Sequence, residues 1–366
     1  MNAQPAGATD EDRVFMQAAF AEAKRALGRT GPNPIVGCVI VRAGEIVARG
    51  YHHKAGEPHA EIMALRDAAA AGVDASECTL YSTLEPCAHQ GLTGPCAKAI
   101  VAARVPRVVY GCEDPNPLVS GRGLLMLEGG AVRVVGPVLE AAAQALILDF
   151  TVSVGEKRPY VIVKAGVTLD ARVATKSGDA KWITSEQARA RGHVLRAEVQ
   201  AIAVGVGTVL ADDPALTTHG RGADPLRVVF DTRLRTPAKA KLVPGAVIVC
   251  AKTAPATRER ALVARGASVL RLPGSTIDVR RALRELYKTR GIMRLLVEGG
   301  PRLVGSLADA GLVDELVMFM APTIFGGAAP SFIAGEGISK LRQAPRFSLE
   351  GVERIGDELM LRYLRA

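Results

Sequence analysis

The chain has 366 residues, of which 48% are hydrophobic and 23% charged, a balance typical of globular proteins. Single hydrophobic cores stop growing at roughly 250 residues, so two domains are expected. Residues 1–13 are polar and acidic, unlike a signal peptide, and no apolar run is long enough for a membrane span. Six cysteines in a chain of this length do not suggest a disulfide framework. These features predict a cytoplasmic protein with no membrane partner.

Charge is distributed unevenly along the chain. Residues 1–150 contain 13 Lys and Arg against 16 Asp and Glu, whereas residues 151–366 contain 33 against 21. A site for long nucleic acids is expected to be surrounded by cations and stacking aromatics, but aromatics make up only 4% of the chain. The composition therefore disfavours nucleic acid as a partner and favours a small-molecule substrate. It leaves open whether the chain forms a homo-oligomer.

Two short motifs in the first half combine metal-binding side chains with a carboxylate. They are His59-Ala60-Glu61 and Pro86-Cys87, the second followed by Cys96. Zinc prefers nitrogen and sulfur ligands, and catalytic sites keep three protein ligands and one open position. His59, Cys87 and Cys96 fit the three ligands, and Glu61 fits the proton carrier that zinc nucleobase deaminases place beside the metal. The motifs together predict a zinc deaminase.

Local structure supports different roles for the imidazole and the carboxylate. A run of helix formers over 60–71 places His59 and Glu61 in the first turn of a helix, where residues two apart do not share a face. One of them is therefore the ligand and the other carries protons. A strand is expected over 78–84, and Pro86 suits a loop or a first helical turn, where the pKa of the Cys87 thiol is lowered.

Two other interpretations remain open for these motifs. Each motif alone occurs by chance, and buried cysteines are common in proteins. The zinc could be structural, in which case His89 or His53 would supply a fourth protein ligand. The chain could also deaminate another base, with a degenerate second domain that serves as a binding module.

The second half alternates strand-like and helix-like segments, which predicts an α/β sheet, after a polar segment over 150–158 that predicts a linker. Gly299-Gly300 stands between a strand and a helix, where backbone amides can approach a phosphate. A tight turn is the more common explanation of such a pair. No Gly-x-Gly-x-x-Gly motif is present, so the usual dinucleotide fold is not predicted. The expected strands are 160–165, 201–205, 227–231, 245–251 and 294–297, and the expected helices are 185–198, 279–289 and 302–310.

Longer motifs resemble the bifunctional riboflavin-biosynthesis deaminase/reductase family over nearly the whole chain. In the first half these are Gly31–Gly37, Gly56–Glu61, Thr83–Gly91 and Asp114–Pro117. In the second half they are Thr168–Asp170, Trp182–Thr184, Leu195–Ala197, Gly207–Pro214 and Glu298–Gly300. The resemblance implies an α/β protein with two domains. Residues 1–150 would form a cytidine-deaminase-like domain, a mixed sheet flanked by helices, and residues 151–366 a dihydrofolate-reductase-like domain.

The resemblance also implies two reactions on a small phosphorylated pyrimidine, with Zn²⁺ and NADPH as cofactors. The first replaces the C2 amino group of 2,5-diamino-6-ribosylamino-4(3H)-pyrimidinone 5′-phosphate by oxygen. The second reduces the ribosyl side chain and gives 5-amino-6-ribitylamino-uracil 5′-phosphate.

Residue roles follow from the same resemblance. The substrate would contact Asn33 and His52 in the first domain, and Arg196, Leu216 and Glu298 in the second. NADPH would be held by Gly166, Trp182, Thr208, Asp212, Gly300, Pro301, Arg302, Leu303, Val304, Gly305 and Ser306.

Five positions depart from the family pattern. Leu92 and His219 each stand where the family has arginine, which removes two fixed cations that could bind a phosphate. Gly94 replaces a proline, Ala171 a glycine and Ala180 a serine that faces the substrate. The zinc ligands and Glu61 are intact, so the sequence supports the deaminase step better than the reductase step.

Overall fold

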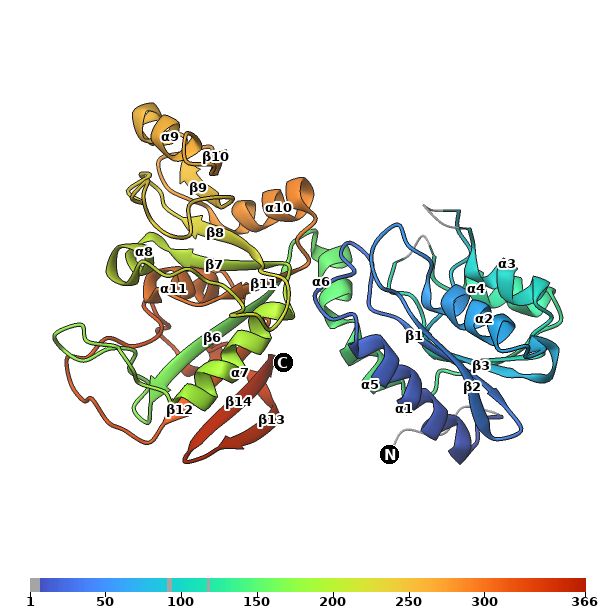
Figure 1. Ribbon diagram of the computed structural model, residues 1–366. Coiled ribbons are helices and arrows are strands. Elements are labelled where there is room, and N and C mark those ends of the chain that lie inside the picture. The colour runs from blue at the N-terminus through green and yellow to red at the C-terminus, as the bar shows by residue number, and fades with distance from the viewer. Residues whose placement is uncertain (1–6, 91–93, 117–118) are drawn as a thin grey trace. The chain divides into compact units, whose positions relative to one another are not determined.

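The computed structural model describes residues 7–90, 94–116 and 119–366 (Figure 1). The chain divides into two compact units, Met1–Lys157 and Arg158–Ala366, and each contains its own sheet. In the described residues, no helix combines the length and apolar character that crossing a membrane requires.

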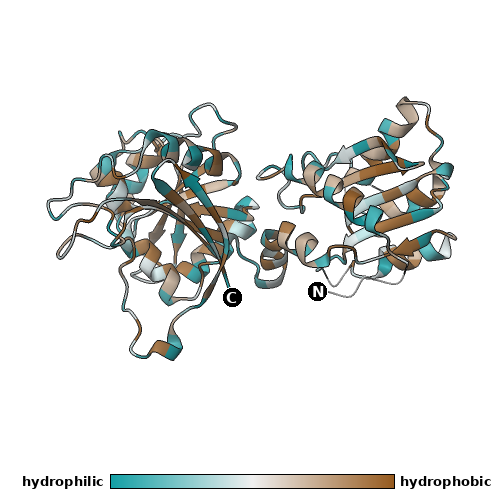
Figure 2. Cartoon of the chain, turned by 90° about the horizontal axis from the view of Figure 1, so that it is seen from below, coloured by the Kyte–Doolittle hydropathy of each residue, from teal (hydrophilic) through white to brown (hydrophobic). Residues whose placement is uncertain are grey.

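The described part of the first unit is built on a mixed sheet of five strands in the order β2-β1-β3-β4-β5. β1 pairs antiparallel with β2 and β3, whereas β4 pairs parallel with β3 and β5. Hydrophobic residues are concentrated on these strands (Figure 2). The strands are β1 (Gly37–Arg42), β2 (Glu45–Tyr51), β3 (Thr79–Leu84), β4 (Arg107–Cys112) and β5 (Arg133–Val135). The helices are α1 (Asp10–Lys24), α2 (Ala60–Ala70), α3 (Cys96–Ala102), α4 (Arg122–Gly129), α5 (Glu140–Leu146) and α6 (Leu148–Glu156), with a 3₁₀ turn at Ala75–Glu77.

Two glycines bring helices close to opposite faces of this sheet. A Cβ on Gly37 would lie 2.1 Å from the carbonyl oxygen of Ala19 in α1, and one on Gly50 would lie 2.3 Å from that of Ala60 in α2. Gly50 is paired with Cys38, the neighbour of Gly37 on β1. Because successive residues of a strand face opposite sides, α1 and α2 cover opposite faces. The sheet is thus flanked by helices, as expected.

The described part of the second unit has nine strands in the order β10-β9-β8-β7-β11-β6-β12-β14-β13. Neighbours are parallel from β10 to β12, and the last two pairings are antiparallel. The strands are β6 (Tyr160–Thr168), β7 (Ala201–Gly205), β8 (Leu226–Phe230), β9 (Val247–Ala251), β10 (Ser268–Leu272), β11 (Arg294–Val297), β12 (Glu315–Ala321), β13 (Phe347–Ile355) and β14 (Glu358–Arg365). The helices are α7 (Glu186–Ala197), α8 (Val206–Asp212), α9 (Ala256–Val263), α10 (Val279–Arg290) and α11 (Pro301–Asp309), with a 3₁₀ turn at Leu341–Gln343.

The expected helices and strands are present, but the predicted linker is wrong. Residues 150–158 lie mostly in α6, which ends at Glu156, followed by Lys157 in the left-handed conformation. Phe150 and Ser153 are buried, whereas Thr151 and Glu156 are exposed, so this segment is a helix with one buried side. Arg158 is also buried and forms a two-pronged ion pair with Asp314, with N–O distances of 2.6 and 2.8 Å. The charged residues of this segment suggested a linker, but Glu156 belongs to α6 and Arg158 to a buried ion pair.

Candidate functional site

Three predicted metal ligands lie together in the first unit. The Nδ1 atom of His59 is 3.5 Å from the Sγ atom of Cys87 and 3.3 Å from that of Cys96. The ligand atoms of all three lie within 4.8 Å of one another, and Cys87 and Cys96 are buried. One nitrogen and two sulfurs at this spacing suit zinc in a catalytic site, which takes three protein ligands.

Three segments meet to build this cluster. His59 is the N-cap residue of α2, not a residue of its first turn, and α2 lies against β2 because Gly50 has no side chain. Cys96 is the first residue of α3, whereas Cys87 lies in the loop after β3. The backbone N–H of Cys96 donates to the Sγ atom of Cys87 at 3.4 Å. Cys87 therefore does not begin a helix itself. It accepts a hydrogen bond from the first backbone N–H of the helix that Cys96 begins.

The electrostatics of the cluster favour a thiolate at Cys87. A hydrogen bond with the Cys96 thiol, together with His59, lowers the pKa of Cys87 to about 4, and the same contact helps to raise the pKa of Cys96. Thiolate is the form that binds a metal. Glu61 is buried in the first turn of α2, and burial, followed by the nearby Cys87, raises its pKa to about 7. A carboxyl group with a pKa near neutrality suits transfer of protons in both directions.

Asn33 and His52 lie beside the cluster. The Asn33 amide nitrogen is 3.0 Å from Nε2 of His52, and Nδ1 of that ring is 3.2 Å from the carbonyl oxygen of Pro58. Because the carbonyl can only accept, the partners assign the proton to Nδ1, and Nε2 accepts from Asn33. Burial lowers the pKa of His52. Its ring meets that of His59 edge-on with 5.1 Å between centroids, so His52 stands next to a metal ligand and Asn33 contacts His52 in turn.

Sequence reasoning gave no role of its own to Glu85, which lies within the Thr83–Gly91 motif. Its buried carboxylate accepts three backbone N–H groups, from Asp114 at 3.3 Å, Gly121 at 3.0 Å and Gly123 at 2.8 Å. It thereby ties the loop that carries Cys87 to the start of α4. The position of Glu85, between a buried strand and a metal-ligand loop, was the available signal, because a buried carboxylate needs donors.

The predicted fourth ligands of a structural site do not join the cluster. His89 is exposed, and His53 packs against Tyr51 with 4.1 Å between ring centroids. Within the described ranges, the metal-binding group consists of His59, Cys87 and Cys96. Three protein ligands favour the catalytic interpretation over the structural one.

In the second unit, Arg196 and Glu298 form the centre of a charged group. The Nε and Nη2 atoms of Arg196 donate to the two carboxylate oxygens of Glu298, each at 2.8 Å, and its Nη1 atom donates to the Thr217 carbonyl at 2.7 Å. Burial of Glu298 is outweighed by the charges of Lys164 and Arg196, which lower its pKa to about 2. These side chains come from β6, from α7 and from the end of β11, so the sheet assembles them from distant parts of the chain.

The start of α11 fits a phosphate-bearing cofactor. Gly300 is its N-cap residue and Pro301 its first residue. A Cβ on Gly300 would lie 3.2 Å from Oγ1 of Thr208, so glycine keeps the backbone at this turn accessible. Backbone N–H groups at such a helix start bind anions.

The other predicted cofactor residues of α11 differ in whether their side chains are free to contact a ligand. The side chains of Leu303 and Val304 belong to the hydrophobic core, and a Cβ on Gly305 would lie 1.6 Å from the carbonyl oxygen of Ala334. Arg302 is exposed, and Ser306 donates to the carbonyl oxygen of Arg302 at 3.0 Å. In this segment, the backbone rather than the apolar side chains can therefore contact a ligand.

The remaining predicted residues of the second unit are Gly166, Trp182, Asp212 and Leu216. Gly166 lies on β6, where a Cβ would meet Thr184 at 3.2 Å. Trp182 is 69% exposed, with the Arg189 guanidinium 4.2 Å from its ring centroid, so it is not a core residue. Asp212 ends α8 and lies 3.9 Å from the Lys181 ammonium group. Leu216 is buried.

Two departures from the family pattern have visible consequences. Ala171 has a φ of 58°, a left-handed conformation that glycine adopts at less cost. His219 stacks on His193 with 4.1 Å between ring centroids, and burial followed by Arg196 lowers the pKa of His193 to about 4. Leu92 lies outside the described residues. Gly94 and Ala180 have no contacts that explain their replacement.

Comparison with known proteins agrees with the division into two units. Residues 9–112 match the model of the cytidine and deoxycytidylate deaminase zinc-binding region, and residues 159–361 match that of the RibD C-terminal domain. The chain belongs to the RibD family of riboflavin-biosynthesis enzymes. RibD of Aquifex aeolicus is 40% identical over 97% of this chain and 98% of its own length. RibD of Escherichia coli is 39% identical over 97% of this chain and 100% of its own length.

Solved structures extend the agreement to three dimensions. RibD of Acinetobacter baumannii has a TM-score of 0.86 at 36% identity and covers 97% of this chain and 99% of its own. A diaminohydroxyphosphoribosylaminopyrimidine deaminase/5-amino-6-(5-phosphoribosylamino)uracil reductase of Thermotoga maritima has a TM-score of 0.85 at 34% identity, with the same coverage. This RibD-family chain is therefore a bifunctional enzyme with a cytidine-deaminase-like unit and a RibD reductase unit.

Proposed function

We propose that this chain deaminates 2,5-diamino-6-ribosylamino-4(3H)-pyrimidinone 5′-phosphate and then reduces the ribosyl side chain of the product with NADPH. The observation that carries the proposal is the cluster of His59, Cys87 and Cys96 with buried Glu61 beside it. The charged group around Glu298 on the second sheet supports a second, separate reaction. It also argues against the alternative of a degenerate second domain.

In the deaminase site, His59, Cys87 and Cys96 would hold the zinc ion. The metal supplies the Lewis acidity that makes water nucleophilic near neutral pH. Glu61 takes a proton from the water that attacks C2 and delivers it to the amino nitrogen, which leaves as ammonia. Water oxygen thereby becomes bonded to C2 as the carbon–nitrogen bond breaks.

Asn33 and His52 position the pyrimidine. His52 donates its Nδ1 proton to Pro58 and accepts from Asn33, which fixes the orientation of the Asn33 amide. The oxygen of that amide then serves as an acceptor for donors on the ring. Neutral His52 adds no charge beside the zinc ligands, since burial lowers its pKa.

In the reductase site, Arg196, Leu216 and Glu298 contact the ribosyl pyrimidine phosphate. Arg196 holds the Glu298 carboxylate by two hydrogen bonds, and the oxygens of that carboxylate keep lone pairs for ribose hydroxyl groups. Bound NADPH would supply the hydride that reduces the ribosyl carbon. Gly166, Trp182, Thr208, Asp212 and the backbone of residues 300–306 hold this cofactor.

The proposed setting is the cytoplasm, with a small phosphorylated pyrimidine as substrate and without nucleic acid. None of the six cysteines forms a disulfide, as suits a reducing compartment. The first 150 residues carry more acidic than basic side chains, which argues against a nucleic-acid substrate at the zinc site. A homo-oligomer stays a prediction.

The test is to incubate the purified protein with the diaminopyrimidinone phosphate, with and without NADPH, and to identify the products by mass. The expected results are the uracil form without NADPH and the ribityl form with it. Deamination without reduction would contradict the second half of the proposal. Absence of ammonia release from the zinc-loaded protein would contradict the first half.

A further inference from the structure

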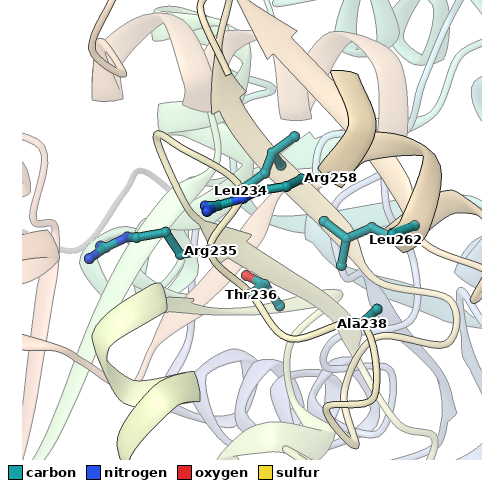
Figure 3. Close-up of a pocket in the computed structure, with 7 residues that line it drawn as sticks. Leu234, Arg235, Thr236, Ala238, Arg258 and Leu262 are labelled. Atoms are coloured by element: carbon teal, nitrogen blue, oxygen red, sulfur yellow. The ribbon is translucent and has the colours of Figure 1, made fainter. Parts of the chain in front are cut away.

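Arginine side chains of the second unit differ in how firmly they are held. Arg235 and Arg258 line a pocket of about 310 Å³ beside α9 (Figure 3), and Arg258 donates to a carbonyl oxygen at the long distance of 3.4 Å. Arg189, on α7, is held at two points. Its Nη1 atom donates to the Thr184 carbonyl oxygen at 2.6 Å, and its guanidinium carbon lies over the ring of Trp182, 4.2 Å from the centroid. The ring face attracts a cation in this position.

Trp182 is the only tryptophan of the chain, and its side chain is 69% exposed. Because the Arg189 guanidinium covers one face of the indole, the exposed area belongs to the opposite face and the edges. Aromatic rings stack on other flat rings in an offset arrangement. An indole that is held on one face and open on the other therefore suits a ligand with a flat ring.

The backbone beside the indole is anchored to the sheet. Ser185, the N-cap residue of α7, donates from its backbone N–H and its hydroxyl to the two carboxylate oxygens of buried Glu358, at 2.7 and 2.9 Å. Thr184 packs against β6, where a Cβ on Gly166 would lie 3.2 Å from its Cγ2 atom. The freedom left to the indole is rotation about its own side-chain bonds, which the guanidinium restricts.

The same face of α7 also carries a predicted substrate residue. Arg189 and Arg196 are seven residues apart, which puts them on one face of the helix with a rise of about 10 Å between them. Gly192 lies between them, and a Cβ there would come within 3.4 Å of the Cε atom of Lys164, so this face is directed at β6. Arg196 holds the Glu298 carboxylate. One helix thus supports the indole and the charged group two turns apart.

We propose that Arg189 is a positioning residue that holds the indole of Trp182 as a platform for a flat ring of the reductase cofactor. Among the residues that the structure describes, no carboxylate pairs with Arg189, so its partners are the ring and the Thr184 carbonyl. The inference rests on the proposed function, which gives Trp182 to the cofactor. Arg189 acts through the indole and contacts neither substrate nor cofactor.

The first test uses the emission of Trp182, since no other tryptophan contributes to it. In Arg189→Ala, the fluorescence anisotropy should fall and quenching by acrylamide should rise, because the indole gains rotamers and a second open face. Arg189→Lys keeps the charge but loses the planar contact, so it should give intermediate values. The control is Arg191→Ala, which removes an arginine of the same helix that pairs with Glu353 and should leave both quantities at the wild-type level.

Reductase kinetics, started from the deaminated substrate, distinguish positioning from general damage. In Arg189→Ala the KM for NADPH is expected to rise about 3- to 30-fold, the value of one cation–π contact. The kcat, the KM for the ribosyl substrate and the deaminase activity should stay unchanged. Titration with NADPH gives a readout apart from turnover, because quenching of Trp182 emission by the cofactor should require concentrations higher by the same factor.

Three results would overturn the inference. These are an indole that is as immobile in Arg189→Ala as in the wild type, a released indole with an unchanged KM for NADPH, and an equal rise in KM for both substrates. If NADPH quenches Trp182 in the wild type and binds Arg189→Ala equally well, the inference alone fails. If wild-type protein neither oxidises NADPH nor shows quenching by it, the proposed reductase function fails, and the inference fails with it.

Discussion

The two candidate sites differ in how the chain brings their residues together. The metal ligands lie between residues 59 and 96 and come from a helix cap, a loop and a helix start within one small sheet unit. The charged group of the second unit extends from Lys164 to Glu298 and is assembled because β6, β11 and β7 are neighbours in the sheet. The first site is thus visible in short motifs, whereas the second depends on strand order.

The chemistry of the two sites explains the same difference. Zinc requires nitrogen and sulfur atoms from particular side chains, so its site leaves a signature in residue type and spacing. A dinucleotide can be held by backbone N–H groups at a helix start, which many sequences provide. The structure shows this at α11, where Leu303 and Val304 serve the core and only the turn at Gly300 is open to a ligand.

The largest effect is expected from a change at Glu61, which should abolish one activity and leave the other unchanged. In Glu61→Gln, ammonia release is expected to fall about 10²- to 10⁴-fold, because the amide cannot carry a proton between water and amine. Zinc content, measured by mass spectrometry, should stay at the wild-type level because the three ligands are unchanged. Reduction of the already deaminated substrate should also be unaffected.

Two outcomes would contradict this prediction. Residual ammonia release of more than a few per cent would remove Glu61 from the proton-transfer role. An equal loss of the reductase step would show that the two sites do not act independently.

The sequence predicted most of the fold and the centre of the first site, and the failures have physical causes. The polar segment 150–158 resembles a linker because its charges mark the exposed side of α6 and the buried pair between Arg158 and Asp314. Glu85 was missed because its partners are backbone N–H groups, which leave no pattern of residue types. The pocket at Arg235 and Arg258 was missed because only the fold brings the segment after β8 to α9.

A second variant tests whether the metal centre depends on residues beyond its motif. In Glu85→Gln, the amide NH₂ group would face backbone N–H groups that now donate to the carboxylate, so the Cys87 loop should loosen. The expected result is a 10- to 100-fold loss of zinc affinity or of deaminase turnover at limiting zinc, about the range for groups that support metal ligands. Glu128→Gln, on the exposed side of α4, is the matched control. Unchanged zinc affinity in Glu85→Gln would show that the motif alone sets the geometry.

A third variant tests the dispersed site in the same way. Arg196→Lys keeps the charge beside Glu298 but loses the two parallel hydrogen bonds. The KM for the ribosyl substrate is expected to rise about tenfold in the reductase step, roughly the value of one charge-assisted hydrogen bond. Arg191→Lys on the same helix, which changes an exposed pair with Glu353, should have no effect. Equal behaviour of the two variants would contradict the substrate role of Arg196.

The smallest effect on turnover is expected from Asp12→Asn, on the sheet face opposite α2. Asp12 accepts hydrogen bonds from Arg107 at 2.7 and 2.8 Å and from Tyr81 at 2.8 Å. Although burial acts in the opposite direction, these partners lower its pKa from 3.8 to about 2. A lowered pKa in the folded state stabilises the protein above pH 4, and this contribution disappears as pH falls toward 2.

Asp12→Asn should therefore reduce the unfolding free energy of the first unit by about 2 kcal/mol at pH 7. Thermal denaturation followed through ammonia release and through NADPH oxidation distinguishes the units, because only the deaminase activity should be lost at a lower temperature. The difference between variant and wild type should shrink as pH falls below 4. A difference that stays constant down to pH 2 would show that packing rather than charge makes Asp12 stabilising, and a parallel loss of both activities would show that the two units unfold together.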